Sequence, residues 1–145
     1  TELRSHFHEE LAQLEHDLVV MGEHAAKMIS DSMAALVASD ADAAQAVIEF
    51  DDVVDDLFLD VHERGLATMA LQTPVAIDLR LMSVILHVNS HLERIADLAV
   101  TVAKITELAD GLPHDSTVVS HLQEMADMVA TMVGTVMGAF ANRDL

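Results

Sequence analysis

Apolar residues recur three and four positions apart through almost the whole chain, which is the period of amphipathic α-helices. The first such segment runs from Leu3 to about Ala38. A polar turn follows it, in which Asp40 is suited to cap the next helix. The second segment covers about residues 41–71, and its apolar stripe comprises Val47, Phe50, Val54, Leu57 and Val61.

A third helix is predicted to start at Thr73 and Pro74, because threonine is a good N-cap and proline is tolerated at the first helical position. Gly111 and Pro113 are stop signals that end this helix. Asp115 or Ser116 then caps a fourth helix, which reaches about Ala141. The apolar stripe of the third helix comprises Leu81, Val84, Ile85, Val88, Leu92, Ile95, Leu98, Val102 and Ile105.

Four long helices with short connections predict an all-α fold. Since a few residues can join long helices only as antiparallel neighbours, the first three helices are expected to form an up-down three-helix bundle over residues 1–110. An extended coiled coil is the alternative, which the clear turn signals disfavour. The predicted core contains Val54, Leu57, Val88, Leu92 and Ile95.

The fourth helix repeats the first. A shift of about 104 positions superimposes Leu18 on Leu122, Met21 on Met125, Met28 on Met132, Met33 on Met137, Ala35 on Ala139 and Asp40 on Asp144. A shared apolar period explains part of this agreement, but the matched methionines and the final aspartate are harder to obtain that way. We therefore interpret residues 115–145 as the first helix of an incomplete second repeat.

The chain is strongly acidic, with 25 Asp and Glu against 7 Lys and Arg and a net charge of −18. Such a surface repels nucleic-acid phosphates and anionic lipids, whereas it attracts metal cations or a basic partner; a merely solvated acidic surface is the simpler interpretation. The lack of cysteine fits a reducing compartment. With a charged N-terminal segment and apolar runs too short for a membrane span, we expect a cytoplasmic protein without membrane insertion.

Carboxylates spaced four residues apart on one helix face are candidate ligands for hard cations. Such pairs are no more frequent here than random scatter gives, so their spacing alone proves nothing. Asp51 and Asp55 flank the apolar stripe of the second helix, whereas Asp52 and Asp56 lie on its solvated side. Because an unpaired carboxylate is costly at a core boundary, Asp51 and Asp55 are the better ligand pair.

A second acidic pair, Glu93 and Asp97, lies on the third helix. It falls away from the predicted stripe, on an outer face that also carries Leu79, Met82 and Leu86. His87 and His91 have zinc-ligand spacing, but nine histidines in the chain weaken that signal. The sequence has no Glu-x-x-His motif, glycine-rich phosphate loop or nucleophile elbow, so no enzyme class is indicated.

Two motifs carry a family resemblance: Pro74-x-x-x-Asp78-Leu79-Arg80, and about a dozen residues later Leu92-Glu93-Arg94-Ile95-x-Asp97. Together with the segment Asp51-x-x-Val54-Asp55, they resemble the PhoU family of phosphate-signalling proteins. The resemblance implies two tandem three-helix repeats, of which most of the second is missing here. It also implies metal clusters on E(D)-x-x-x-D motifs, which correspond to Asp51, Asp55, Glu93 and Asp97, with Mg, Mn, Fe or Zn as the candidate ions. Ala96 stands where the family commonly has glycine.

The function implied by this resemblance is regulatory and not enzymatic. PhoU proteins are negative regulators of the phosphate-starvation response, and they couple the phosphate ABC transporter and its ATPase to a sensor histidine kinase by protein–protein contact. An alternative of another class stays open, namely a carboxylate metal-binding bundle that stores metal or acts as a metalloenzyme.

The fourth helix is apolar on more than one face. Two further helices would cover it in a complete repeat. Here it can fold over the outer face of the third helix, at Leu79, Met82 and Leu86, or pair with the same helix of a second chain. One neighbour covers only one side, so the pattern favours a homodimer.

Overall fold

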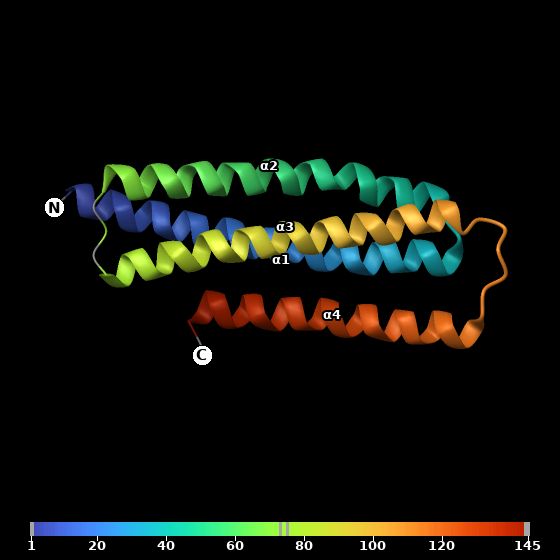
Figure 1. The fold of residues 1–145 in the computed structure, drawn as a ribbon. Helices are drawn as coiled ribbons and strands as arrows, with labels where there is room; N and C mark the ends of the chain where they lie inside the picture. Colours follow the sequence, from blue (N-terminus) through green and yellow to red (C-terminus); the bar gives the residue numbers. More distant parts are fainter. Residues whose placement is uncertain (1, 73, 75, 144–145) are drawn as a thin grey trace.

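The protein forms four long helices in a computed structural model that describes residues 2–72, 74 and 76–143, with side chains from Ser5 onward. These helices are α1 (Glu2–Ala38), α2 (Ala41–Leu71), α3 (Ala76–Leu108) and α4 (Ser116–Asn142), and the part described contains no strand. The first three run up, down and up around a common core, while α4 returns antiparallel to α1 (Figure 1). The predicted all-α fold and antiparallel three-helix bundle are confirmed.

The turns show why the helices begin where they do. The Asp40 carboxylate accepts a 2.9 Å hydrogen bond from the backbone N–H of Ala43, and Asp115 caps α4 in the same way, both as predicted. Gly111 adopts the left-handed conformation, with φ of 73°, in the turn after α3. Thr73 lies outside the described residues. Pro74 precedes α3, which begins at Ala76, so proline does not occupy the first helical position as predicted.

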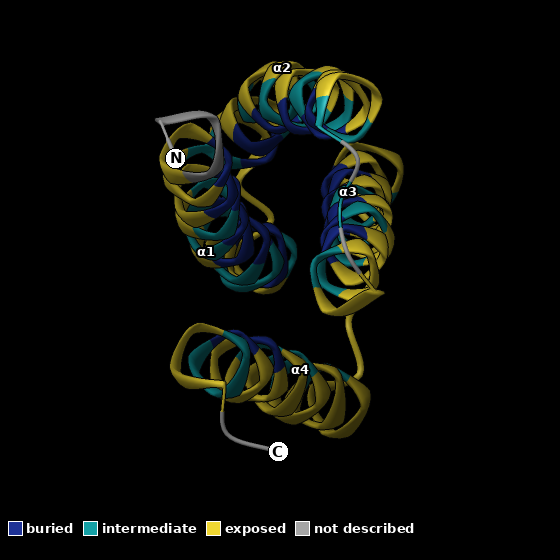
Figure 2. Cartoon of the chain, turned by 90° about the vertical axis from the view of Figure 1, so that its left-hand side faces the viewer, coloured by how far each residue is buried: buried dark blue, intermediate teal, exposed yellow. Residues whose placement is uncertain are grey.

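Each bundle helix turns a regular seam of alternating three- and four-residue steps toward the core (Figure 2). Of the predicted core residues, Val54 and Leu92 are buried, whereas Leu57, Val88 and Ile95 are half-buried at its edge. The α1 seam comprises Phe7, Leu11, Leu14, Leu18, Met21, Ala25, Met28, Ser32 and Ala35.

The predicted apolar stripe of α3 only partly matches the buried face of the helix. Val84, Leu98 and Ile105 are exposed by 44% or more, whereas Met82, assigned to the outer face, is fully buried. The true seam consists largely of small and polar residues, which allow close helix approach, while larger aliphatic residues lie beside it. Its members are Met82, Ile85, Asn89, Leu92, Ala96, Ala99, Ala103 and Thr106.

An ion-pair cluster joins α1 to α2. The Arg64 guanidinium donates to Glu10 at 2.8 Å and to Asp17 at 2.7 Å on α1, and to Asp60 at 2.7 Å on its own helix. These hydrogen bonds raise the pKa of Arg64 against the opposing effect of burial, which means that the arginine stays charged. The cluster therefore holds the two helices in register.

The fourth helix packs against α1, and in the described part of the chain it approaches neither α2 nor α3 closely. Its placement over the outer face of α3, one of the two predicted arrangements, is therefore wrong. Leu86 instead packs beside Gly65 of α2. Close approach of α4 depends on Gly22 of α1, where an added Cβ would lie 2.5 Å from Cγ of Met137.

Candidate metal site between α2 and α3

The register of α2 and α3 brings the two predicted acidic pairs near each other. The side-chain amide of Asn89 donates a 2.9 Å hydrogen bond to the backbone carbonyl of Phe58, which sets these residues level with each other. Because the helices are antiparallel, one heptad along each helix brings Asp51 level with Ala96. Glu93 and Asp97 lie on either side of Ala96, so this register places them near Asp51 and Asp55 of α2, and we call these four residues the acidic cluster.

Asp51 is the innermost of the four carboxylates. It occupies a seam position of α2, four residues after Val47 and three before Val54, both of which are buried. Burial raises the pKa of Asp51 most, and the negative charges of Asp55 and Asp97 raise it further. Lys104 lowers this pKa, as the weakest of the contributions.

The pKa values of Asp55 and Glu93 are raised for the same reasons. Burial is the main cause for Asp55, followed by the charge of Asp97 on the facing helix. Burial also leads for Glu93, followed by the charge of Asp97, a hydrogen bond with it, and the charges of Asp55 and Asp51. The charges of the α2 and α3 pairs therefore influence each other's pKa values, so the fold places the two pairs near each other.

The acidic cluster contains an unsatisfied acceptor, because Oδ1 of Asp51 is buried and has no hydrogen-bond partner within the described structure. A buried carboxylate oxygen without a partner destabilises the fold unless a proton or a cation reaches it. Oxygen donors from facing helices are the set that hard cations such as Mg²⁺, Mn²⁺ or Fe³⁺ prefer. The donors and the unsatisfied oxygen thus fit the metal that the resemblance implies.

The side chains are not drawn together around a single point. Among the described residues, no three His, Asp or Glu side chains are close enough to one another to hold a metal ion. Asp51, Asp55 and Glu93 are half-buried and Asp97 is exposed. The site therefore has the right residues on facing helices, but a bound ion would require their side chains to turn inward.

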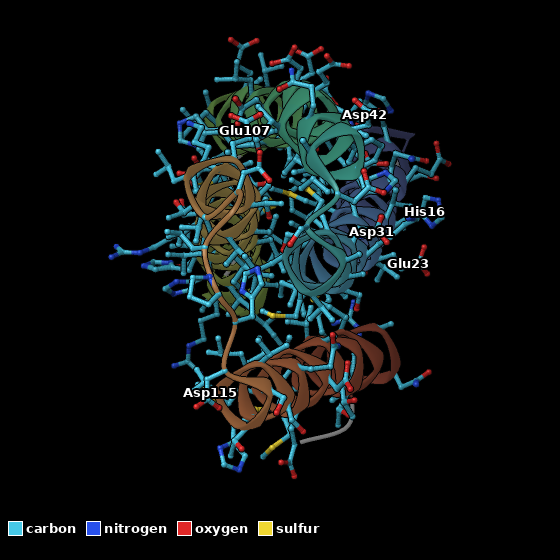
Figure 3. All side chains as sticks on the ribbon, turned by 90° about the vertical axis from the view of Figure 1, so that its right-hand side faces the viewer. His16, Glu23, Asp31, Asp42, Glu107 and Asp115 are labelled. Carbon is cyan, nitrogen blue, oxygen red and sulfur yellow. The ribbon has the colours of Figure 1, made fainter. Side chains whose placement is uncertain are left out.

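The other acidic residues of α2 behave as the helical wheel predicts. Asp52 and Asp56 are exposed, one residue along the chain from Asp51 and Asp55. Glu23, Asp42 and Glu107 likewise point outward from the bundle (Figure 3). Burial thus separates Asp51 and Asp55 from the exposed acidic residues next to them on α2.

The histidine pair on α3 lies close to the acidic pair of the same helix, and His91 lines one shallow pocket with Glu93 and Asp97. His87 and His91 are both exposed, and Nδ1 of His87 lies 2.7 Å from the backbone carbonyl of Ser83. That nitrogen donates to its own helix and is therefore not free to bind zinc in this arrangement.

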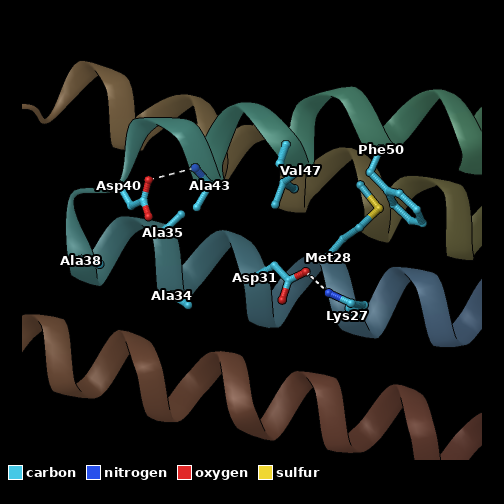
Figure 4. A pocket seen from close by; sticks show the side chains of 11 residues that line it. Lys27, Met28, Asp31, Ala34, Ala35, Ala38, Asp40, Ala43, Val47 and Phe50 are labelled. Atoms are coloured by element: carbon cyan, nitrogen blue, oxygen red, sulfur yellow. Dashed lines mark hydrogen bonds and ion pairs between the residues drawn. The ribbon is translucent and has the colours of Figure 1, made fainter.

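A cavity of about 520 Å³ between α1 and α2 is a second candidate for ligand binding (Figure 4). Its walls are mostly alanine, with Met28, Val47 and Phe50 at its inner side. Its polar groups are already engaged, because Lys27 pairs with Asp31 and Asp40 caps α2. Ligand sites normally offer several free polar groups that converge, so this cavity is the weaker candidate.

The comparison with known families agrees with the motifs. The profile of the PhoU domain matches residues 18–106, which include both acidic pairs and Arg64. The chain belongs to the PhoU family.

Several curated PhoU proteins are similar over nearly the whole chain. The phosphate-specific transport system accessory protein PhoU homolog of Clostridium acetobutylicum is 32% identical over 143 residues, which are 98% of this chain and 65% of that protein. The homolog of Rhizobium meliloti is 33% identical over 97% of this chain and 60% of its own length, and PhoU of Escherichia coli is 30% identical over 96% and 57%. The chain thus spans 57–65% of the length of these relatives.

Sequence reasoning named the four carboxylates and Ala96 but missed Asn89. Asn89 is fully buried in the seam and sets the register of α2 against α3, and Ala96 is fully buried in the same seam. The uninterrupted three- and four-residue spacing of Asn89, Leu92 and Ala96 is the signal that identifies them as core positions.

Proposed function

We propose that this chain is a regulatory accessory protein of phosphate transport. It couples the phosphate ABC transporter, through the transporter ATPase, to a sensor histidine kinase in the cytoplasm. By contact with the kinase it holds the phosphate-starvation response off when phosphate is plentiful. The observation that carries the proposal is the PhoU domain over residues 18–106, together with relatives that are named phosphate-specific transport system accessory proteins.

The shape of the molecule supports regulation by contact. Helices of 27 to 37 residues present long, rigid faces, which suit recognition by other helices. None of the described helices is both long and apolar enough to cross a membrane. An acidic surface of net charge −18 favours partners with basic surfaces.

Metal binding is the second part of the proposal. Asp51 and Asp55 of α2 and Glu93 and Asp97 of α3 are the ligands, and the ion supplies positive charge that offsets their mutual repulsion. Because these ligands lie on two helices, binding tightens the α2–α3 contact and fixes the outer faces that a partner recognises. The unsatisfied Oδ1 of Asp51 and the raised pKa values of three of the four carboxylates support this assignment.

The regulatory part is tested by retention of the kinase or the transporter ATPase on immobilised protein, with and without phosphate. We expect retention that depends on phosphate, and we expect Asp51→Asn with Glu93→Gln to weaken it. The matched control, Asp52→Asn with Asp56→Asn, removes the same kind of charge from exposed positions of α2. Retention of neither partner at any phosphate concentration would contradict the regulatory role.

The metal part is tested separately by calorimetric titration with Mn²⁺ or Mg²⁺. Wild type and the Asp52, Asp56 control should bind equally, and the Asp51, Glu93 variant should bind much more weakly. Equal heats from all three proteins would reject the site. A metal-loaded protein with redox or hydrolytic turnover would instead favour the alternative of a metal-storing bundle or metalloenzyme, which the unsatisfied oxygen of Asp51 also fits.

A further inference from the structure

A fully buried polar residue, Asn89, lies near the middle of α3 and bonds to another helix. Its side-chain amide donates the 2.9 Å hydrogen bond to the backbone carbonyl of Phe58, whereas its Oδ1 has no hydrogen-bond partner within the described structure. A buried amide with an unpaired oxygen makes the fold less stable than an apolar side chain of similar shape does. Stabilisation of the core therefore does not explain why this position is asparagine.

Hydrophobic burial does not fix the rotation of α3 about its own axis. One row of α3 points inward at seven-residue intervals, is fully buried and is mostly small or polar: Met82, Asn89, Ala96 and Ala103. A nearby row has the same spacing and larger aliphatic side chains but is only half-buried: Leu81, Val88, Ile95 and Val102. Ile85 and Leu92 lie between the two rows. A turn of α3 by about 50°, which is one position on a heptad wheel, would therefore bring the second row inward in place of the first.

The same turn would separate the acidic cluster. Leu86 packs beside Gly65 of α2, and Glu93 lies seven residues after Leu86 on the same side of α3. Bringing the aliphatic row inward turns this side away from α2. Because side-chain heads lie about 5–6 Å from a helix axis, a turn of about 50° moves each of them by about 5 Å. Glu93 and Asp97 would therefore move outward, away from the carboxylates of α2.

The hydrogen bond of Asn89 distinguishes between the two rotations. A turn that moves its amide by about 5 Å breaks the bond to Phe58, and Val88, which would take the inward position, has no side-chain donor. A single asparagine at a core position is a known means of fixing the register of packed helices at a cost in stability. We propose that Asn89 is the positioning residue of the acidic cluster: its bond to Phe58 selects the rotation of α3 that brings the two acidic pairs together. The consequence for metal binding rests on the proposed function.

Spin labels on α2 and α3 test the rotation without metal. Gln45→Cys with Thr101→Cys provides the attachment points, since both residues are exposed and the chain has no native cysteine. Double electron–electron resonance should give one narrow label distance with Asn89 in place and a shifted or broadened one with Asn89→Leu. Asn89→Ala removes the same donor without adding volume, so it should change the distance as well.

Thr106→Val is the matched control. Thr106 is 3% exposed on the same helix, and its Oγ1 likewise has no hydrogen-bond partner within the described structure. The variant removes a buried polar group and leaves the bond to Phe58 intact, so the label distance should not change. In calorimetric titration with Mn²⁺, Asn89→Leu should bind about tenfold or more weakly than wild type, although it unfolds at no lower denaturant concentration without metal. Thr106→Val should bind as wild type does.

Unchanged label distances in both Asn89 variants would overturn the positioning role. Equal changes in Asn89→Leu and Thr106→Val would also overturn it, because they would assign the effect to a general loosening of the core. Equal Mn²⁺ affinity of wild type and Asn89→Leu would overturn the role while leaving the metal site in place. A wild type that binds no Mn²⁺ would reject the metal part of the proposed function, and the label distances would still decide the role of Asn89.

Discussion

Two helices with matching sequences have opposite environments in this protein. Leu18, Met21 and Met28 of α1 are at most 2% exposed. Their counterparts 104 positions later on α4, Leu122, Met125 and Met132, are 38%, 61% and 63% exposed. The difference lies in the neighbours, because α2 and α3 cover that face of α1 and nothing described here covers it on α4.

A second face of these helices is buried on both α1 and α4. Met33 and its counterpart Met137 are each 5% exposed, because both lie where α1 and α4 pack against one another. The two helices therefore use corresponding positions, 33 and 137, in their mutual contact. Each of the two helices thus has two apolar faces. One face is buried on both helices, whereas the other is buried on α1 and exposed on α4.

The largest expected effect is a difference in the free energy of unfolding between alanine variants of Leu18 and Leu122. Leu18→Ala leaves a cavity in the core and should lower the free energy of unfolding by about 2–5 kcal/mol. Leu122→Ala, at concentrations that keep the chain monomeric, should cost less than about 1 kcal/mol, because its side chain is partly in water already. Denaturant unfolding of both variants measures the difference; equal losses would show that α4 is covered within one chain.

A smaller effect is expected from the two arginines that attach helices to α1. Arg64→Gln leaves Glu10 and Asp17 without their partner and should cost about 1–3 kcal/mol. Arg143 makes a single pair with Glu15 at 2.9 Å and is 64% exposed, so Arg143→Gln should cost at most about 0.5 kcal/mol. Thermal unfolding at low and high salt compares them, and a larger loss for Arg143→Gln would contradict the ranking.

The attachment of α4 can be loosened at Gly22. Gly22→Ala forces Met137 to move, which should cost the α1–α4 contact about 1 kcal/mol. Hydrogen exchange should therefore become faster in α4 while the bundle core stays protected. Gly138→Ala is the control, because nothing lies near the added methyl and alanine favours the helix. Faster exchange in the bundle core as well would show that α4 is part of one cooperative unit.

The smallest expected effect is a pH dependence of stability. It arises from Asp51 in the three-helix bundle and not from α4. The pKa of Asp51 is raised in the folded chain, mainly by burial, so folding favours its protonated form. Its ionisation therefore makes the bundle less stable as the pH rises from the ordinary carboxyl range through the raised pKa.

Without metal, Asp51→Asn should stabilise the protein at neutral pH, and this advantage should vanish in acid. The exposed Asp52→Asn serves as the control. Unfolding curves between acid and neutral pH provide the measurement, and a gain that persists in acid would assign the effect to packing.

The candidate site shows how far sequence reasoning extends. The acidic pairs are local features that a helical wheel places correctly on α2, because Asp51 follows Val47 by four residues. On α3 the wheel failed, since apolar residues surround the helix and the small seam residues Ala96 and Ala99 gave no hydrophobic signal. The distance between the pairs depends on the register set by Asn89, which no local pattern specifies.

The sequence by itself determined the four helices, their caps at Asp40 and Asp115, and the antiparallel bundle. These follow from periodicity, turn chemistry and short connections, all of which act between near neighbours in the chain. Only the tertiary structure decided which face of α3 is inside, that the two acidic pairs lie near each other, and that α4 rests on α1. Each of these depends on how closely helices approach, and small residues such as Gly22 and Gly65 allow that approach through contacts with side chains distant in the sequence.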